Sequence, residues 1–479
     1  MLFEPAYTTL STHHKVIRMN TVDAIVIGSG QAGTPLSKKL ASAGYKTVLI
    51  EKEHVGGTCV NEGCTPTKTL IGHATIADRV RNSAQWHVFA PGMTVDYEAI
   101  WKKKNEVVQR FRDGSEAGIK ATEGLQLVYG EAAFTGPNTV EVQLPTGGRE
   151  LYYAEKIYIN AGCRPAIPDI PGLAEVPYLT SKELLQLNQL PQHLIILGGS
   201  YIALEMAQLF HRLGSKVTVL EKSPALLYKE DADISECIHG ILQQEGITVH
   251  TNVSIDRIER QMNEDVVVHL HKNKLPETLT GTHLLVATGR KSNADKLKVE
   301  NAGLLIDNKG FIQVDAYLQT NVPGIYALGD IKGGPAFTHV AYNDYVVILR
   351  NLLENKGLNI EGRIVPYCMF TDPQLGRVGI TEREAREKGI PITVFTLPMT
   401  RVARGIETGF TKGIMKAVVH SETDHILGAA IIGEQAGETI TVLQMAMLAG
   451  FTREDIRYMM IAHPLYAESL NNLFMQQGK

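Results

Sequence analysis

The chain has 479 residues, of which 44% are hydrophobic and 20% charged, and its formal net charge is −4. This composition is that of a globular protein of about three domains, and it argues against a nucleic-acid or membrane partner, which would require a concentrated basic field. No apolar run is long enough to cross a membrane. Residues 1–20 lack the apolar segment of a secretory signal, so we expect an N-terminal tail there and a cytoplasmic protein.

The first predicted element is a strand, turn, helix and strand over residues 23–52. In its opening DAIVIGSGQAG, Gly28, Gly30 and Gly33 complete the pattern G-x-G-x-x-G, and Glu51 ends the second strand. Such a turn lets the backbone approach a pyrophosphate at the N-terminus of a helix, while the carboxylate accepts hydrogen bonds from a ribose. The unit therefore predicts a dinucleotide site.

A close pair of cysteines follows in the stretch GGTCVNEGCTPTK, where Cys59 and Cys64 are two of the chain's five cysteines. Zinc is disfavoured because no second cysteine pair or nearby His-x-x-x-His motif completes a ligand set, and we predict no metal site. A structural bridge is disfavoured because five cysteines in so long a chain indicate a reducing compartment. A redox couple is the interpretation that we favour.

The spacing of this pair also constrains the local backbone. Residues five apart in a regular helix have Cα atoms about 8–9 Å from each other, whereas a disulfide requires them within about 7 Å. We therefore predict that the helix is interrupted between Cys59 and Cys64, with Gly63 supplying the conformational freedom, and that it continues from Pro66.

The second predicted unit repeats the first at an offset of 170 residues. HLIILGGSYIA and GSKVTVLEK again form a strand, turn, helix and strand that ends in a glutamate, Glu221. Its turn keeps Gly198, has an acceptable Ala203 in the third position, and departs from the pattern at Ser200. A second dinucleotide is implied, and the carboxylate of Glu221 favours NADH over NADPH because it would repel a 2′-phosphate.

Six motifs in order resemble those of the flavin-dependent pyridine nucleotide-disulfide oxidoreductases, which include glutathione reductase, dihydrolipoamide dehydrogenase and mercuric reductase. They are the cysteine stretch, the two glycine turns, ATGRKSN, GIYALGD, FTDPQLGRVG and HPLYAESL. The resemblance implies an α/β fold with two Rossmann-like dinucleotide-binding domains, for FAD and NAD(P), and a C-terminal α+β dimerisation domain. The expected boundaries are 21–162 and 291–355 for the FAD domain, 163–290 for the NAD(P) domain and 356–479 for the dimerisation domain.

The resemblance also assigns catalytic roles. Cys64 would lie nearest the flavin, and Cys59 would be the thiol that exchanges with substrate. His463 and Glu468 would form the acid–base pair, with the histidine supplied by the partner subunit of a homodimer and the bond to Pro464 in the cis form. Without the resemblance, a single C-terminal histidine would be interpreted as structural.

Further positions match the cofactor site of the family. The first turn and Glu51 would bind the FAD adenosine, Asp330 the flavin ribitol, and Gly289 would lie at a crossing between the two nucleotide domains. Lys68 and Glu205 would form an ion pair near the flavin, and Tyr201 would cover the flavin until nicotinamide arrives. On residue type alone, the charged pair would be solvated helix residues and Asp330 a turn residue.

The predicted reaction moves electrons from NAD(P)H through FAD to a Cys59–Cys64 disulfide and on to a disulfide or soft-metal acceptor. The segment RVARGIETGFTKGIMKAVV is most similar to mercuric-reductase-like sequences. Mercuric reductases, however, carry a pair of cysteines at the C-terminus, and no cysteine follows Cys368 here. True mercuric reductase and dihydrolipoamide dehydrogenase stay open as alternatives. A flavin- or NADH-sensing protein without turnover is the alternative from another class.

Two residues of the cysteine stretch depart from the usual pattern, Glu62 and Thr65. A carboxylate beside the thiols would raise their pKa and disfavour anionic acceptors. The alternative is that Glu62 points to solvent, and the sequence does not decide between the two.

Overall fold

The computed structural model describes residues 19–262, 264–272 and 275–478. Residues 1–18 of the expected tail lie outside these ranges, but the expectation is wrong for Met19 and Asn20. They begin strand β1 (Met19–Thr21), which pairs in parallel with Leu151–Tyr153. The backbone of β1 therefore finds its partners more than a hundred residues along the chain, which a local pattern does not reveal.

A parallel sheet in the order β19-β8-β2-β3-β4 forms the first Rossmann unit. Its inner strands are buried along their whole length, as expected for a parallel sheet covered on both faces. The strands are β2 (Ala24–Ile27), β3 (Thr47–Glu51), β4 (Leu125–Tyr129), β8 (Lys156–Ile159) and β19 (Ile325–Ala327). Helices of this unit are α1 (Gly33–Ser42), α2 (Gly57–Asn61), α3 (Cys64–Arg81), α4 (Tyr97–Lys120) and α8 (Thr338–Glu354).

Strand β19 joins this sheet although about 165 residues separate it from its neighbour β8. The chain between them leaves the first unit, builds a second one and returns. A small antiparallel ribbon marks the crossing, made of β9 (Cys163–Pro165) and β18 (Arg290–Ser292). Another sheet flanks the first unit, made of β1, β5 (Glu131–Gly136), β6 (Thr139–Gln143) and β7 (Arg149–Tyr153).

The second Rossmann unit repeats the parallel arrangement in the order β10-β17-β11-β12-β13. Its strands are β10 (Tyr178–Leu179), β11 (His193–Leu197), β12 (Lys216–Leu220), β13 (Thr248–His250) and β17 (His283–Val286). Its helices are α5 (Ser181–Gln186), α6 (Tyr201–Leu213) and α7 (Ala232–Gln244). An antiparallel sheet extends from it, made of β14 (Val253–Arg260), β15 (Val266–Lys272) and β16 (Leu275–Gly281).

The C-terminal unit is an antiparallel sheet in the order β20-β21-β24-β23-β22, so the expected fold class is confirmed. Its strands are β20 (Tyr367–Met369), β21 (Gln374–Gly379), β22 (Ile392–Pro398), β23 (Ile414–His420) and β24 (Ile426–Gly433). Its helices are α9 (Glu382–Glu387), α10 (Ala403–Thr408), α11 (Ala436–Leu448), α12 (Arg453–Tyr458) and α13 (Ser469–Phe474). Within the described residues, no helix is both long and apolar enough to cross a membrane.

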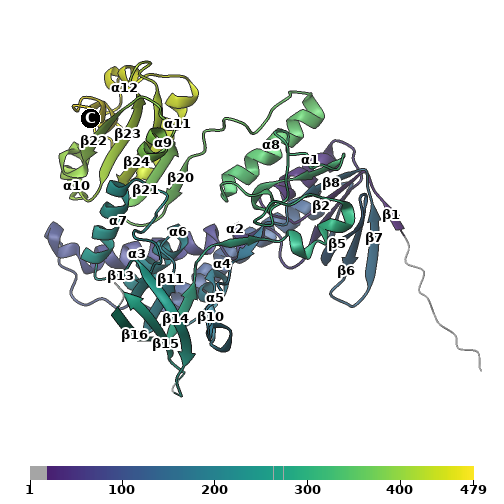
Figure 1. The fold of residues 1–479 in the computed structure, drawn as a ribbon, viewed down its shortest axis with the longest axis horizontal. Helices are drawn as coiled ribbons and strands as arrows, with labels where there is room; N and C mark the ends of the chain where they lie inside the picture. Colours follow the sequence, from purple (N-terminus) through teal and green to yellow (C-terminus); the bar gives the residue numbers. More distant parts are fainter. Residues whose placement is uncertain (1–18, 263, 273–274, 479) are drawn as a thin grey trace, which may run out of the picture.

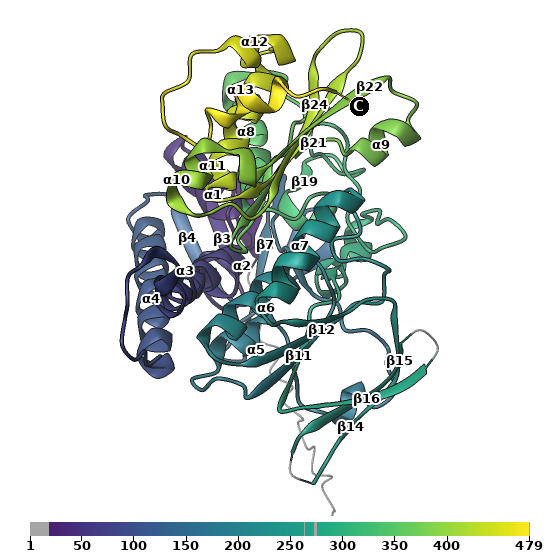
Figure 2. The ribbon, with the colours of Figure 1, turned by 90° about the vertical axis from the view of Figure 1, so that its left-hand side faces the viewer.

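The three units meet around the middle of the molecule (Figure 1). The C-terminal unit lies above the second Rossmann unit, and the first Rossmann unit with α8 lies beside both. Figure 2 shows α6 and α7 directly under the C-terminal sheet.

A buried arginine ties these units together. Arg212 of α6 is 5% exposed and pairs with Glu245 at 2.7 Å, with Asp372 before β21 at 2.6 Å, and with Asp78 of α3 at 3.5 Å. One guanidinium thus pairs with a carboxylate from each of the three units.

Replacing Arg212 by Met should strongly destabilise the protein, because it leaves several carboxylates near the interior without a cation. Loss of one partner of a buried pair costs about 3–5 kcal/mol. Thermal unfolding followed by circular dichroism measures the effect. Arg79→Met, which breaks an exposed pair with Glu434, is the control and should cost about 1 kcal/mol or less. Equal melting temperatures for the two variants would contradict this role.

Candidate active site

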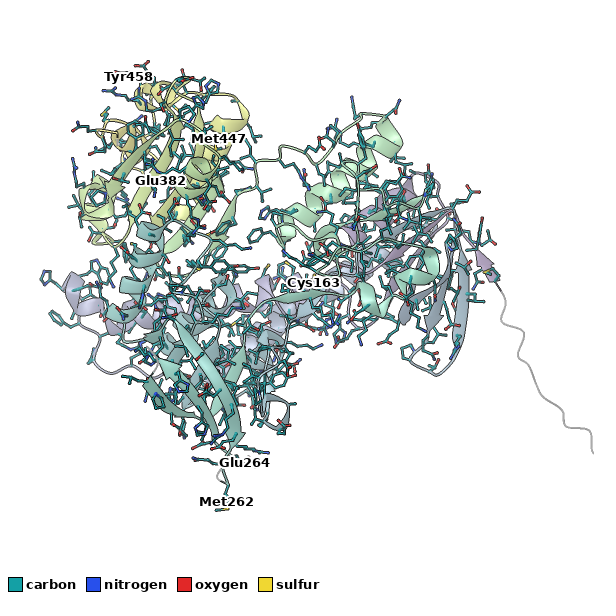
Figure 3. The ribbon with its side chains drawn as sticks, viewed as in Figure 1. Cys163, Met262, Glu264, Glu382, Met447 and Tyr458 are labelled. Carbon is teal, nitrogen blue, oxygen red and sulfur yellow. The ribbon has the colours of Figure 1, made fainter. Side chains whose placement is uncertain are left out.

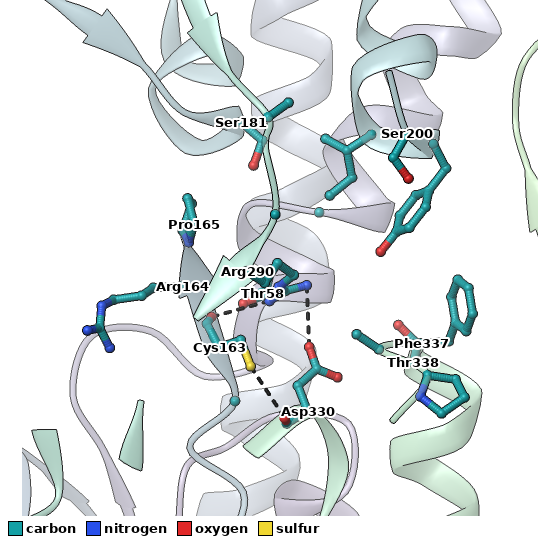
Figure 4. A pocket seen from close by; sticks show the side chains of 18 of the residues that line it. Thr58, Cys163, Arg164, Pro165, Ser181, Ser200, Arg290, Asp330, Phe337 and Thr338 are labelled. Atoms are coloured by element: carbon teal, nitrogen blue, oxygen red, sulfur yellow. Dashed lines mark hydrogen bonds and ion pairs between the residues drawn. The ribbon is translucent and has the colours of Figure 1, made fainter. Parts of the chain in front are cut away.

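A cavity of about 3380 Å³ runs through the middle of the molecule and is lined by both glycine turns and by the cysteine pair. Sites for a single small ligand usually occupy about 300–1,000 Å³, so this cavity has room for more than one large ligand. Figure 4 shows part of it, with Thr58, Arg290, Asp330 and Thr338 arranged around the space.

The first glycine turn joins β2 to α1 and has no space for side chains. A Cβ on Gly33 would lie 1.9 Å from the carbonyl oxygen of Gly28, and one on Gly28 would lie 2.4 Å from that of Asn160. The Asn160 side chain closes the turn by accepting a hydrogen bond from the Gly33 amide at 2.9 Å. A Cβ on Gly30 would also meet Asn160, at 2.8 Å. The sequence analysis missed Asn160, since it follows β8, far along the chain.

Glu51 lies at the end of β3, as predicted, and is 7% exposed. One carboxylate oxygen accepts hydrogen bonds from the Ser29 amide at 3.0 Å and the Ser29 hydroxyl at 2.6 Å, and the other accepts from the Glu53 amide at 2.9 Å. A carboxylate has about four acceptor positions, so Glu51 is held in place and can still accept from a ribose hydroxyl. The turn and this carboxylate fit the adenosine half of FAD.

The second turn has the same form. A Cβ on Gly198 would lie 2.5 Å from the Ala287 carbonyl oxygen, and one on Gly199 would lie 2.9 Å from the carboxylate of Glu221. Glu221 is 8% exposed and accepts a hydrogen bond from the Ser223 amide at 2.6 Å. Ser200 is exposed at the start of α6. Its side chain therefore fits at the position where the pattern expects glycine.

The cysteine pair lies where two helices meet end to end. Helix α2 ends at Asn61 and α3 begins at Cys64, so the predicted interruption is confirmed. Gly63 allows the bend, because a Cβ there would lie 2.8 Å from the Thr58 carbonyl oxygen. Both thiols are free, and the Cys64 sulfur lies 3.4 Å from the hydroxyl of Thr338 at the start of α8.

The two thiols are not equivalent. The interaction with Cys59, with smaller contributions from Thr338 and Lys68, outweighs burial and lowers the pKa of Cys64 to about 6. The same interaction, together with burial, raises the pKa of Cys59. The thiolate form is therefore favoured at Cys64 and the thiol form at Cys59.

Lys68 and Glu205 form the expected ion pair, with 2.7 Å between the ammonium nitrogen and a carboxylate oxygen. The other oxygen of Glu205 accepts a hydrogen bond from the Phe370 amide at 2.8 Å, so the pair connects α3, α6 and the segment after β20. Tyr201 begins α6 and packs against Phe337, with 5.8 Å between the ring centroids. Their positions relative to a flavin stay predictions.

Asp330 lies at the crossing between the two Rossmann units. Its carboxylate is 3.3 Å from the Arg290 guanidinium, and its carbonyl oxygen accepts from the Cys163 thiol at 3.3 Å (Figure 4). Burial raises the pKa of Cys163 to about 11, so it is a neutral thiol. Gly289, just before Arg290, has φ +143° and lines the same cavity.

A fully buried carboxylate that the sequence analysis missed supports the Asp330 turn. Asp344 of α8 is 0% exposed and accepts a hydrogen bond from the Gly329 amide at 2.8 Å. Arg363 at 2.8 Å and Lys332 at 3.4 Å neutralise it. Only the folded chain brings these cations to Asp344, and no sequence motif marks it.

His463 and Glu468 pair with each other, with 3.0 Å between Nδ1 and a carboxylate oxygen, but His463 does not line the cavity of its own chain. Its side chain is 69% exposed, and the His463–Pro464 bond is cis, as the resemblance implied. Within one chain, therefore, the predicted acid–base pair is not beside the cysteines.

Glu62 neither stands free beside the thiols nor points only to solvent. Its carboxylate lies 2.7 Å from the ammonium of Lys182, a residue of the second Rossmann unit that the sequence analysis did not single out. Glu62 is therefore held in an ion pair.

Two glycine turns of the dinucleotide-binding type and a pair of neighbouring cysteines line one cavity. Together these features define a dithiol–disulfide oxidoreductase. The sequence pattern of the pyridine nucleotide-disulphide oxidoreductases matches residues 22–344, and that of their dimerisation domain matches residues 365–474. The chain belongs to this family. It is therefore an FAD- and NAD(P)H-dependent oxidoreductase.

Individual relatives agree with this assignment. The chain is 37% identical to the probable pyridine nucleotide-disulfide oxidoreductase RclA of Escherichia coli, over 95% of this chain and 99% of RclA. It is 35% identical to the mercuric reductase of Bacillus cereus, over 94% of this chain and 70% of that enzyme. The solved Cu(II) complex of the HOCl-induced flavoprotein disulfide reductase RclA superimposes with a TM-score of 0.87 at 36% identity, covering 95% of this chain and 99% of that structure.

The depressed pKa of Cys64 predicts how its reactivity depends on pH. Since the thiolate is the nucleophile, alkylation of reduced Cys64 by iodoacetamide should rise as pH passes about 6 and level off above neutrality. Cys59→Ala removes the hydrogen-bond donor and should move the midpoint to higher pH. Peptide mass spectrometry measures the rate at Cys64. A wild-type midpoint in the ordinary thiol range, or no shift in the variant, would contradict this electrostatic assignment.

Proposed function

We propose that the protein passes electrons from NAD(P)H to a Cys59–Cys64 disulfide and from the resulting dithiol to a disulfide or soft-metal acceptor. The observation that carries this proposal is the position of Cys59 and Cys64 in the wall of the cavity that both glycine turns line. FAD, when bound, would supply the two-electron transfer between nicotinamide and the disulfide.

The geometry supports an assignment of residues to the two cofactors. The first turn and Glu51 would bind the adenosine of FAD, and Asp330 would bind its ribitol. The Lys68–Glu205 pair and Tyr201 would lie at the face of the flavin that nicotinamide approaches. The second turn with Glu221 suits NADH, because a carboxylate that is already buried would repel a 2′-phosphate.

Each cycle of the proposed thiol chemistry begins and ends with the Cys59–Cys64 disulfide. Reduction of the disulfide by two electrons, with uptake of one proton, leaves Cys59 as a thiol and Cys64 as a thiolate. Cys59 loses its proton to a base and attacks the acceptor disulfide, releasing one thiolate of the acceptor, which takes up that proton. The Cys64 thiolate then attacks the Cys59 sulfur, restores the internal disulfide and releases the second thiolate.

We assign the base to His463 of the partner subunit, held by Glu468, which makes a homodimer part of the proposal. Apolar side chains that a dimer would cover lie on the C-terminal unit, and Figure 3 shows one of them, Tyr458, at its outer end. The most exposed large apolar side chains of this unit are Ile406, Met445, Leu448, Tyr458, Met460, Leu465 and Met475.

A soft cation is the second candidate acceptor. The exposed Cys64 thiolate beside a second thiol is a ligand pair of the kind that soft metals prefer. The relationship to mercuric reductases and to a flavoprotein whose structure is a Cu(II) complex supports this candidate.

Anaerobic titration of the FAD-loaded protein with NADH tests the central proposal. Reduction should produce the long-wavelength absorbance of a thiolate beside oxidised flavin, together with two newly alkylatable thiols, Cys59 and Cys64. Cys64→Ser should abolish that absorbance and the reduction of disulfide and Cu(II) acceptors. Unchanged thiol reactivity after NADH, with full activity of Cys64→Ser, would favour a sensing protein without turnover.

The preference for NADH rests on Glu221 and can be tested separately. Glu221→Arg removes the repulsion of a 2′-phosphate and supplies a cation, so the ratio of kcat/KM for NADH to that for NADPH should fall by about tenfold or more. Steady-state kinetics with the same acceptor measures both values. A wild-type protein that already uses NADPH better would contradict the assignment.

A further inference from the structure

Lys182 forms a charged clamp with Glu53 and Glu62 at the edge of the cavity. The Lys182 ammonium lies 2.7 Å from a carboxylate oxygen of Glu62 and 2.9 Å from each carboxylate oxygen of Glu53. All three residues line the cavity. Figure 4 shows Ser181, which precedes Lys182, and Thr58, which precedes Cys59, around the same space.

The clamp connects segments that are far apart in the chain. Glu62 occupies the bend between α2 and α3, between the two cysteines. Glu53 follows β3, where its amide donates a hydrogen bond to Glu51. Lys182 belongs to the second Rossmann unit, and a capping box formed by Thr180 and Glu183 fixes the start of its helix.

The charges of the clamp are set by the interactions within it. Burial lowers the pKa of Lys182, but hydrogen bonds to Glu62 and Glu53 outweigh burial and raise it. The hydrogen bond from Lys182 lowers the pKa of Glu53. The side chains of Lys182 and Glu62 are only 31% and 28% exposed, which limits screening by solvent. Lys182 is thus a cation shared by two carboxylates.

We propose that Lys182 is a positioning residue for the redox pair: by anchoring Glu62 it restrains the bend between the cysteines and favours closure of the Cys59–Cys64 disulfide. Without the anchor, the bend of the dithiol form has more conformations, and disulfide formation must remove that extra freedom. The two thiols are already close enough for each to be the largest influence on the pKa of the other. This inference rests on the proposed function, because it assigns Lys182 to the same cysteine pair.

The equilibrium with dithiothreitol measures this effect. Oxidised dithiothreitol takes two electrons and one proton from Cys59 and Cys64, which form one S–S bond, and a second proton from solvent, and it becomes reduced dithiothreitol. The FAD-loaded protein is equilibrated anaerobically over a range of oxidised to reduced dithiothreitol, quenched with acid and alkylated. Mass spectrometry of the peptide that contains both cysteines then gives the equilibrium constant.

Lys182→Met and Glu62→Gln should each lower this constant by about three- to tenfold, the scale of a partly buried ion pair of about 1 kcal/mol. The double variant should show no further decrease, because both changes remove the same anchor. Glu53→Gln removes the other carboxylate that pairs with Lys182. Because Glu53 is not part of the bend, this variant should have a smaller effect. Lys102→Met, which breaks the exposed pair with Glu98 on α4, is the charge-matched control and should have none.

The outcomes separate the two proposals. If the wild-type protein forms no Cys59–Cys64 disulfide at any ratio, both the proposed function and this inference are overturned. If it forms one and neither Lys182→Met nor Glu62→Gln changes the constant, only the inference is overturned. If Lys182→Met does not fold, as judged by circular dichroism, Glu62→Gln alone decides, since it removes the anchor from the other side.

Discussion

The active site depends on an interrupted helix. The thiols of Cys59 and Cys64 can touch only because α2 ends at Asn61 and α3 begins at Cys64, with Gly63 in a bend that has no space for a side chain. Their proximity lowers the pKa of Cys64 and raises that of Cys59. The difference between the thiols is therefore a consequence of backbone geometry.

The surrounding fold brings charged groups from separate units to this bend. Helix α3 carries Lys68 to Glu205 of α6, and α5 carries Lys182 to Glu62. Arg212 holds the same units together from the buried side. Because Lys68, Lys182 and Arg212 each pair with a carboxylate on another unit, the position of the second Rossmann unit and the geometry of the cysteine pair are physically connected.

Local patterns predicted the parts of the site that local geometry controls. The glycines of the first turn and Glu51 were predicted because a strand, tight turn and helix bring them together within about thirty residues. Asn160 and Asp344 were missed, although one closes the first turn and the other supports the turn before Asp330. Their partners lie in distant segments, so a single sequence contains no periodicity or spacing that marks them.

By itself the sequence determined the two Rossmann units, the break between the cysteines and the family, since each depends on spacing between neighbouring residues. The tertiary structure decided which charges meet: Glu62 pairs with Lys182, and His463 with Glu468 lies away from the cysteines of its own chain. Ion pairs between distant segments depend on how sheets and helices pack. The stretch around Cys59 and Cys64 therefore specifies the thiol chemistry, whereas the folded chain specifies the charges that surround it.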